Sequence, residues 1–343
     1  MQVRRVRTME EFAAASGISR PTVSKYFQDP ASVRPATRMR IEDALERLEY
    51  RPNIYAINQN RRLTKNIGIV VPLLADPFFG KIARTIEDLC GGAGFRPILL
   101  SSNGEREREI ENLETLRSLK PAGALIAPLG RMSDRQAVAE FAAEVPTVLF
   151  DSNFPGVGAA FVGLDVEASV RLMVEYLCAS GEPPCLFEMA DPPNPNARRR
   201  RAAYEAAMGA LGHAPMVIPV AGKGWNFEEI GHREGTALLT RKALPSETVL
   251  CSNDRLAIGF LAAAYQRGLR VGIGDGCAMR VAGIDDHPFA RYTCPSLTTI
   301  AQDYDRIAAS SVDALLAAVE DTESAGVREE LTFEGRMVLR ASA

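Results

Sequence analysis

The sequence predicts an N-terminal all-α headpiece with a helix-turn-helix pattern, followed by an α/β region of two Rossmann-like lobes. Three observations lead to this prediction. Residues 8–48 carry three short amphipathic helix patterns separated by turn residues. Residues 67–151 alternate short apolar strands with helices, and the same alternation starts again after about residue 160. The length of 343 residues suits two or three domains rather than one.

The first helix is predicted to begin at Thr8, because Thr8 and Glu11 have the spacing of a capping box. Phe12 and Ala15 give this helix an apolar face. Gly17 then provides the backbone freedom that ends it. The chain is therefore expected to turn sharply after one short helix.

A second helix is predicted directly after this turn. Ser19 is suited to cap it, and Pro21 is tolerated in its first turn. Val23 and Phe27 are four residues apart and form its packing face. Its other face carries Arg20, Thr22, Ser24 and Lys25. This pattern predicts a helix-turn-helix whose second helix enters the DNA major groove, although two short helices around a glycine also occur in other all-α domains.

A third helix is predicted to open near Pro35, a residue suited to a first helical turn. Ile41, Leu45 and Leu48 recur at three- and four-residue spacing and indicate its core face. Pro52 ends the helical pattern.

Three motifs of this head resemble a known family. Thr-Val-Ser-Lys (22–25), Val-Arg-Pro-Ala-Thr-Arg (33–38) and Leu-Glu-Tyr-Arg-Pro-Asn (48–53) match, in order and spacing, the headpiece of the LacI–GalR family of bacterial transcription regulators. The resemblance implies a sequence-specific regulator, a repressor, that binds double-stranded operator DNA as a homodimer on a pseudo-palindromic site. The residues expected at the DNA are Thr8, Ser19, Arg20, Pro21, Thr22, Ser24, Lys25, Arg34, Thr37, Arg38, Asn53, Tyr55, Ala56 and Gln59.

Arg20 is the candidate for base recognition, because arginine pairs bidentately with guanine. Thr22, Ser24 and the arginines of residues 34–40 are expected at phosphates. The charge distribution agrees with this division of the chain. Residues 1–66 contain 13 Lys or Arg against 7 Asp or Glu, whereas the remainder contains 27 against 36. A basic head on an acidic body is expected where only the head meets nucleic acid.

Residues 53–66 carry several cations and no large apolar face, and are expected to be a hinge. In the resembled family this segment folds on operator DNA, and a leucine from each hinge wedges into the minor groove. Here the wedge position falls on Gln59, a poor apolar wedge, so we expect DNA binding with a weakened central kink. Leu63, one turn further on, compensates only if the helix extends.

The body alternates strands and helices, which predicts parallel sheets covered on both faces. Expected strands are 67–72, 96–101, 122–127, 147–151, 185–189, 216–220, 248–251, 280–284 and 330–339. Expected helices are 78–93, 106–119, 133–144, 167–180, 197–211, 227–241, 254–267 and 303–320. The predicted domains are therefore a DNA-binding domain (1–52), the hinge (53–66) and a ligand-binding and dimerisation domain (67–343). Lobe one is placed at about 67–160 and 297–325, and lobe two at about 161–296 and 326–343.

Open parallel sheets bind ligands at the carboxyl ends of their strands, where this sequence places carboxylates, amides, an arginine and aromatic side chains. These side chains suit a small polyhydroxylated or anionic effector. The lobes resemble the family's effector domain, itself similar to periplasmic sugar-binding proteins. That resemblance implies a sugar-like ligand between the lobes, held by Asp76, Phe78, Phe79, Asp151, Arg200, Trp225, Asn253, Asp285 and Tyr304.

Two of these assignments carry alternatives. Four consecutive arginines leave the choice between Arg198 and Arg200 open, because a basic run is also typical of a solvated helix face. Asn253 and Asp254 are equally suited to cap the helix that follows them. Sugar or sugar acid is the default ligand, with sugar phosphate and nucleobase as alternatives, and the sign of the response is open.

Composition narrows the function further. The chain is 46% hydrophobic and 24% charged, has no apolar run long enough for a membrane span and has no signal-peptide pattern, so we expect a cytoplasmic protein. Six scattered cysteines are expected to be small buried residues, and no metal or cofactor site is legible. No leucine-zipper tail follows Val338, which favours a dimer over a tetramer.

No nucleophile elbow or phosphate loop is present, so the protein is not expected to be an enzyme. Two alternatives remain beside the effector-controlled regulator. One is a DNA-binding regulator without effector response. The other is a sugar-binding protein of periplasmic type, which the basic head argues against.

Overall fold

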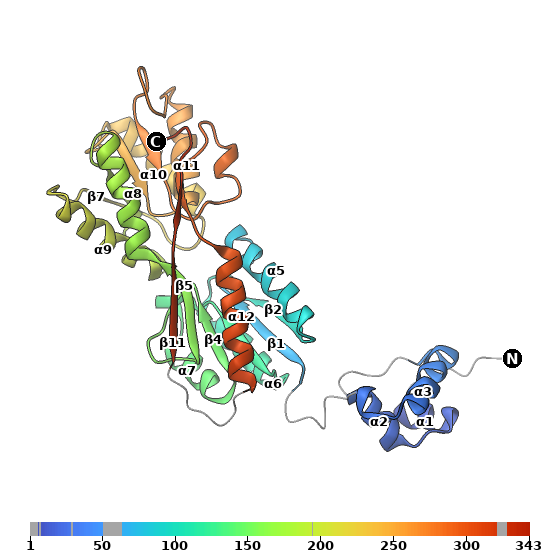
Figure 1. Cartoon of the computed structure of the whole chain (residues 1–343). Helices are drawn as coiled ribbons and strands as arrows, with labels where there is room; N and C mark the ends of the chain where they lie inside the picture. Colours follow the sequence, from blue (N-terminus) through green and yellow to red (C-terminus); the bar gives the residue numbers. More distant parts are fainter. Residues whose placement is uncertain (1–5, 7, 29, 51–63, 194, 321–327) are drawn as a thin grey trace. The chain divides into compact units, whose positions relative to one another are not determined.

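The computed structural model describes residues 6, 8–28, 30–50, 64–193, 195–320 and 328–343 (Figure 1). The chain divides into two compact units, Met1–Thr64 and Lys65–Ala343. The hinge positions expected at the DNA, Asn53, Tyr55, Ala56 and Gln59, lie outside the described residues, as does Leu63.

The first unit is all-helical, with α1 (Met9–Ser16), α2 (Arg20–Gln28), the 3₁₀ turn η1 (Pro30–Ser32) and α3 (Pro35–Leu48). The predicted capping box is confirmed: Glu11 N donates to Thr8 Oγ1 at 3.1 Å, and Thr8 N donates to a Glu11 carboxylate oxygen at 3.3 Å. Gly17 ends α1 in the left-handed region, at φ 67°.

One aromatic cluster holds the three helices together. Phe12 from α1, Val23 from α2 and Ile41 from α3 are each fully buried. The ring of Phe12 stacks on that of Tyr50, with centroids 4.8 Å apart. Phe27 packs partly buried against the same cluster, as its spacing from Val23 predicts. This core fixes the angle between α1 and α2.

The second unit begins with a six-stranded parallel sheet in the order β11-β5-β4-β3-β1-β2. Helices α5 and α12 pack side by side on one face, while α6 and α7 cover the other (Figure 1). We call this sheet with its four helices lobe one. Its elements are β1 (Asn66–Val71), α5 (Pro77–Gly92), β2 (Arg96–Ser101), α6 (Arg106–Ser118), β3 (Gly123–Ile126), η2 (Gly130–Met132), α7 (Arg135–Glu144), β4 (Thr147–Phe150), β5 (Ala160–Asp165), α12 (Tyr304–Glu320) and β11 (Glu329–Glu334).

Lobe two contains a four-stranded parallel sheet in the order β7-β6-β8-β9. Helices α10 and α11 pack on one face, and α8 and α9 on the other. Its elements are α8 (Val166–Ser180), β6 (Cys185–Met189), α9 (Pro195–Ala210), β7 (Val217–Val220), α10 (Phe227–Arg241), β8 (Thr248–Cys251), α11 (Asp254–Gln266), β9 (Arg280–Ala282) and η3 (Ala290–Tyr292).

In the part of the chain that the structure describes, three segments connect the lobes. The chain leaves lobe one between β5 and α8, and returns between β10 (Thr299–Ala301) and α12. It passes to lobe two again between β11 and β12 (Arg336–Val338), where β12 pairs antiparallel with β10. This last connection passes through Gly335. A glycine is required there, because a Cβ would meet Ile300 at 2.3 Å and Ser169 at 2.8 Å.

The sheet order corrects the lobe boundaries expected from the sequence. Ala160–Asp165 forms β5, an unpredicted strand that pairs with β4, so lobe one extends beyond residue 160. Likewise Glu329–Glu334 pairs with β5 in lobe one, although residues 326–343 were expected in lobe two. The cause is that the expected 330–339 strand is divided at Gly335 into two strands that serve different sheets.

The cysteine prediction is partly wrong. Cys90, Cys185 and Cys251 are buried and unpaired, but Cys294 is exposed. Among the described residues no cluster of side chains could hold a metal ion. Within the same residues no helix is long and apolar enough to cross a membrane.

Candidate functional site

The first candidate site is the outer surface of α2 and its neighbours. None of the ten headpiece residues expected at DNA is buried. Those exposed are Thr8, Ser19, Arg20, Pro21, Lys25, Arg34 and Arg38, and those half-buried are Thr22, Ser24 and Thr37. Ser19 Oγ lies 2.8 Å from Thr22 Oγ1 at the start of the helix. Because α2 buries Val23 toward α1 and α3, its polar side chains remain available to a partner.

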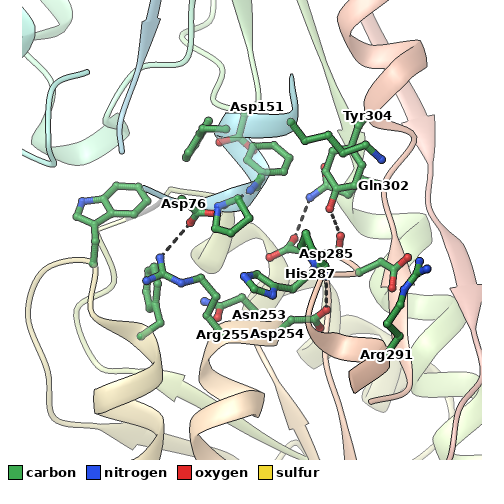
Figure 2. Close-up of a pocket in the computed structure, with 18 of the residues that line it drawn as sticks. Asp76, Asp151, Asn253, Asp254, Arg255, Asp285, His287, Arg291, Gln302 and Tyr304 are labelled. Carbon is green, nitrogen blue, oxygen red and sulfur yellow. Dashed lines mark hydrogen bonds and ion pairs between the residues drawn. The ribbon is translucent and has the colours of Figure 1, made fainter. Parts of the chain in front are cut away.

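The second candidate site is a cavity of about 390 Å³ between the two lobes. Its walls come from the carboxyl ends of strands and the first turns of α5, α11 and α12, as expected for open parallel sheets (Figure 2). All nine side chains predicted at the ligand line this one cavity: Asp76, Phe78, Phe79, Asp151, Arg200, Trp225, Asn253, Asp285 and Tyr304. The volume suits a small molecule.

Arg200 resolves the choice within the arginine run. It is 5% exposed, whereas Arg198 faces solvent. The Arg200 guanidinium forms an ion pair with Asp285 and donates from Nη1 to the Ser252 carbonyl at 2.7 Å. A helix that buries Tyr204 necessarily turns the residue four positions earlier inward as well.

Buried acids surround Arg200. Burial raises the pKa of Asp151 to about 7, although the positive charge of Arg200 opposes the shift. Burial likewise raises the pKa of Glu188 to about 7, again opposed by Arg200. The pKa of Asp285 is raised by burial too. Asp151, Glu188 and Asp285 around Arg200 therefore outnumber this cation, and burial raises the pKa of each.

Asp285 is also the meeting point of three elements. Gln302 Nε2 donates to an Asp285 carboxylate oxygen at 2.8 Å, and the Tyr304 hydroxyl donates to the Asp285 backbone carbonyl (Figure 2). Asp285 has φ 124°, an unusual conformation that these bonds stabilise. Burial raises the pKa of Tyr304, so its hydroxyl remains a donor.

A buried ion pair crosses the cavity from lobe to lobe. Arg255 on α11 donates from Nη1 to Asp76 Oδ2 at 3.0 Å, and both side chains are at most 14% exposed (Figure 2). Asp76 also caps α5 through Phe78 N. The same guanidinium donates to both carboxylate oxygens of Glu228 at 2.7 Å.

Trp225 forms the aromatic wall. Its ring packs against hydrophobic clusters of both lobes and lies edge-on to Phe79, with centroids 6.5 Å apart. Gly104 of lobe one has φ +75°, and a Cβ there would meet Trp225 at 2.5 Å. The glycine therefore allows the indole to approach the opposite lobe.

Asn253 and Asp254 differ in role. Asn253 Oδ1 accepts from Leu256 N at 2.8 Å and caps α11, the alternative that its sequence position left open. Asp254 is fully buried and accepts from His287 N and the Thr299 hydroxyl. Burial raises the pKa of Asp254 to about 8.

Family models match both units. The model described as bacterial regulatory proteins of the lacI family matches residues 8–53, and the periplasmic binding protein-like domain matches residues 178–343. The chain belongs to the LacI family of transcriptional regulators. It is therefore a DNA-binding repressor with an effector-binding domain rather than an enzyme.

Full-length relatives support the assignment. The ribose operon repressor of Escherichia coli K12 is 28% identical over 329 residues, covering 95% of this chain and 97% of its own. A solved lac repressor bound to ONPG in the repressed state is 25% identical, with a TM-score of 0.81 over 98% of this chain and 99% of its own. A lac repressor dimer bound to operator and the anti-inducer ONPF has the same fold, with a TM-score of 0.81, 24% identity and 98% coverage of each chain.

Several residues of this LacI-family chain line the cavity although they were not predicted at the ligand, among them Lys81, Arg255, His287, Arg291 and Gln302. Gln302 follows β10 directly, so predicting the strand Thr299–Ala301 would have found it. Arg255 lies in the first turn of a helix that follows a buried strand, the same signal that identified Asn253. His287 lies two residues beyond Asp285, after the same expected strand end that identified that aspartate.

Proposed function

We propose that this LacI-family chain binds a pseudo-palindromic operator as a homodimer and is controlled by a sugar or sugar derivative bound between its lobes. The observation that carries the proposal is the interlobe cavity of about 390 Å³, which is lined by carboxylates, amides, arginines and aromatic rings. Carboxylates accept hydrogen bonds from hydroxyl groups, amides both donate and accept them, and aromatic faces cover the apolar side of a sugar ring.

In the headpiece, Arg20 reads a base and the surrounding polar residues hold phosphates. Arg20 begins α2 and its side chain is 61% exposed, so it can enter the groove with the helix N-terminus. We expect Arg20→Ala to relax sequence preference by about 1–3 kcal/mol at one base pair. Arg38→Ala should weaken binding to all duplexes alike, because phosphate contacts carry no sequence information. Gel shifts with operator and random DNA measure both effects, and equal loss on the two duplexes for Arg20→Ala would refute its role.

In the effector domain, the ligand lies among Asp76, Asp151, Arg200, Asn253 and Asp285, against the ring of Trp225. The name of the relative matched over 95% of this chain, a ribose operon repressor, supports a sugar as effector. The cavity's mixture of acids and arginines leaves neutral sugars, sugar acids and sugar phosphates as the compounds to compare.

Control follows from a shift of populations. A ligand that binds one arrangement of the lobes more tightly favours that arrangement in both subunits, and operator affinity changes with it. Ligand and operator must then alter each other's affinity by the same factor. Titrating operator in the presence and absence of the ligand gives the sign of the coupling. A lac repressor dimer on its operator, which shares this fold, supports the dimeric assembly.

A thermal-shift screen of the full chain tests the effector assignment. The panel contains neutral sugars, sugar acids, sugar phosphates and purines. A true effector at ~100 times its dissociation constant adds about 2.7 kcal/mol to the stability of the effector domain. The same compounds are tested on Trp225→Leu, which removes the aromatic wall, and on the control Tyr265→Leu, whose side chain is 75% exposed on α11. A shift lost only in Trp225→Leu supports the proposal, and a folded chain that responds to no sugar or sugar derivative would refute it.

A further inference from the structure

An acidic residue lies beside the residue we propose to read a base. Glu10 is in the first turn of α1, and its Oε1 is 2.7 Å from Arg20 Nε at the start of α2. The two side chains are 62% and 61% exposed, so DNA that reaches one also reaches the other. A carboxylate on a basic surface that approaches phosphates is unfavourable unless it has a specific partner. Here the partner is Arg20.

The geometry of the pair distinguishes the two edges of the guanidinium. The contact to Glu10 is made by Nε, so the terminal edge, with Nη1 and Nη2, is not needed for the ion pair. Guanine presents O6 and N7 side by side in the major groove, and two parallel N–H groups of arginine match them. Arginine is a planar fork on a flexible stem, so fixing one edge orients the other.

We propose that Glu10 is a positioning residue for DNA recognition, which holds Arg20 by its Nε edge and so aims the terminal edge at a guanine. This inference rests on the proposed role of Arg20 in base recognition. Glu10 thereby sets how strictly one base pair is read, and contacts no base itself.

Helices α1 and α2, which carry Glu10 and Arg20, pack against one another through a buried core, so the geometry of the ion pair is defined. Phe12 of α1 and Val23 of α2 are both fully buried in the headpiece core. The capping box of Thr8 and Glu11 fixes the turn of α1 that carries Glu10. The ion pair itself is exposed and contributes little to folding, so its loss should alter recognition without unfolding the head.

The test selects binding sites with the full chain from duplexes randomised over a central segment. Arg20→Ala first identifies the base pair that Arg20 reads. Glu10→Ala removes the acceptor, and Glu10→Gln keeps an oxygen that can hold Nε but removes the charge. Glu46→Ala is the matched control, because it removes the same charge from an exposed position on α3.

We expect Glu10→Ala to reduce the preference for guanine at the Arg20 base pair by about tenfold, within the range of one bidentate contact. Glu10→Gln should retain most of the preference, and both variants should bind random duplexes more tightly because one repulsive charge is gone. Glu46→Ala should leave the base preference at that position unchanged.

Two results would overturn the inference. In one, Glu10→Ala keeps the full guanine preference at the Arg20 position. In the other, it changes the preference at a different base pair, which would make Glu10 a reading residue with its own contact. If Arg20→Ala changes the preference at no position, the proposed role of Arg20 fails first, and Glu10 loses its positioning role with it.

Discussion

Replacing Arg200 by methionine tests how the base of the cavity is held together. The Arg200 side chain is 6% exposed, paired with Asp285 and bonded to the Ser252 carbonyl. Methionine fills most of the space but leaves the buried acids without their cation. Breaking a buried pair by removing one partner costs about 3–5 kcal/mol. For a unit of this size that corresponds to a Tm lower by about 6–20 °C.

The cost should depend on pH. An acid with a higher pKa in the folded than in the unfolded state favours folding most below its unfolded-state pKa, and this contribution is lost as pH rises through the folded-state pKa. Asp151 and Glu188 already have folded-state pKa values of about 7. Without Arg200 these values rise further, so at pH 5.5 the acids are protonated and the missing cation matters less.

The assay is thermal unfolding of the full chain at pH 5.5 and pH 8, beside the control Arg201→Met. Arg201 is the next residue of α9, its side chain is 47% exposed, and it forms an ion pair with Glu205 four residues on. Its charge lowers the pKa of Glu188 less than that of Arg200 does. We expect the control to stay within about 0.5 kcal/mol of the wild type. We expect Arg200→Met to lower the free energy of unfolding, relative to the wild type, by at least ~1 kcal/mol less at pH 5.5 than at pH 8. A deficit equal at both pH values, or equal to that of the control, would refute the reasoning.

Three further substitutions probe other contacts. Gly104→Ala should cost at least ~1 kcal/mol more than Gly94→Ala, which shares the left-handed backbone (φ +79°) but has open space around it. Because Trp225 is the sole tryptophan, its fluorescence should change in Gly104→Ala alone, and an unchanged spectrum would contradict the contact. Asp76→Asn keeps a helix-capping oxygen but loses the charged hydrogen bond to Arg255 across the cavity. We expect the free energy of unfolding, measured by thermal unfolding, to fall by about 1–3 kcal/mol. An unchanged value would mean that the ion pair is not formed. Thr8→Ala should destabilise the headpiece by about 1 kcal/mol, measured by amide hydrogen exchange in the full chain, and unchanged exchange in α1 would count against the cap.

Much of the fold could be predicted because local signals and tertiary packing agree. Capping residues such as Thr8 mark helix starts, and apolar runs such as Ile67–Val71 mark buried strands. The missed strand Ala160–Asp165 is joined to its neighbour β4 by only nine residues. This connection is too short for the helical crossover that the alternation predicts. The lobe boundaries depend on strand pairing across more than 150 residues, which no local pattern reveals.

The candidate site was predicted through the strand-end rule and through the resemblance to the LacI–GalR family. Both identify which positions face the cavity, and neither tells which side chains bond to one another. The ion pair between Asp76 and Arg255 joins residues 179 apart in sequence, so it appears only in the folded chain. Asp76 was predicted as a ligand contact rather than as the partner of Arg255, and Arg255 was not predicted at all, because the two residues are so far apart in sequence.

The three connections between the lobes have a consequence for how the protein is made. Lobe one begins with β1 near residue 66, yet its sheet is incomplete until β11 is added at Glu329–Glu334. Helix α12, which packs beside α5 on one face of this sheet, is also synthesised after all four strands of the lobe-two sheet. A nascent chain on the ribosome therefore exposes an unfinished sheet edge and a partly uncovered apolar face until α12 and β11 have been synthesised. Lobe two, whose four strands follow one another in sequence, can assemble its sheet earlier.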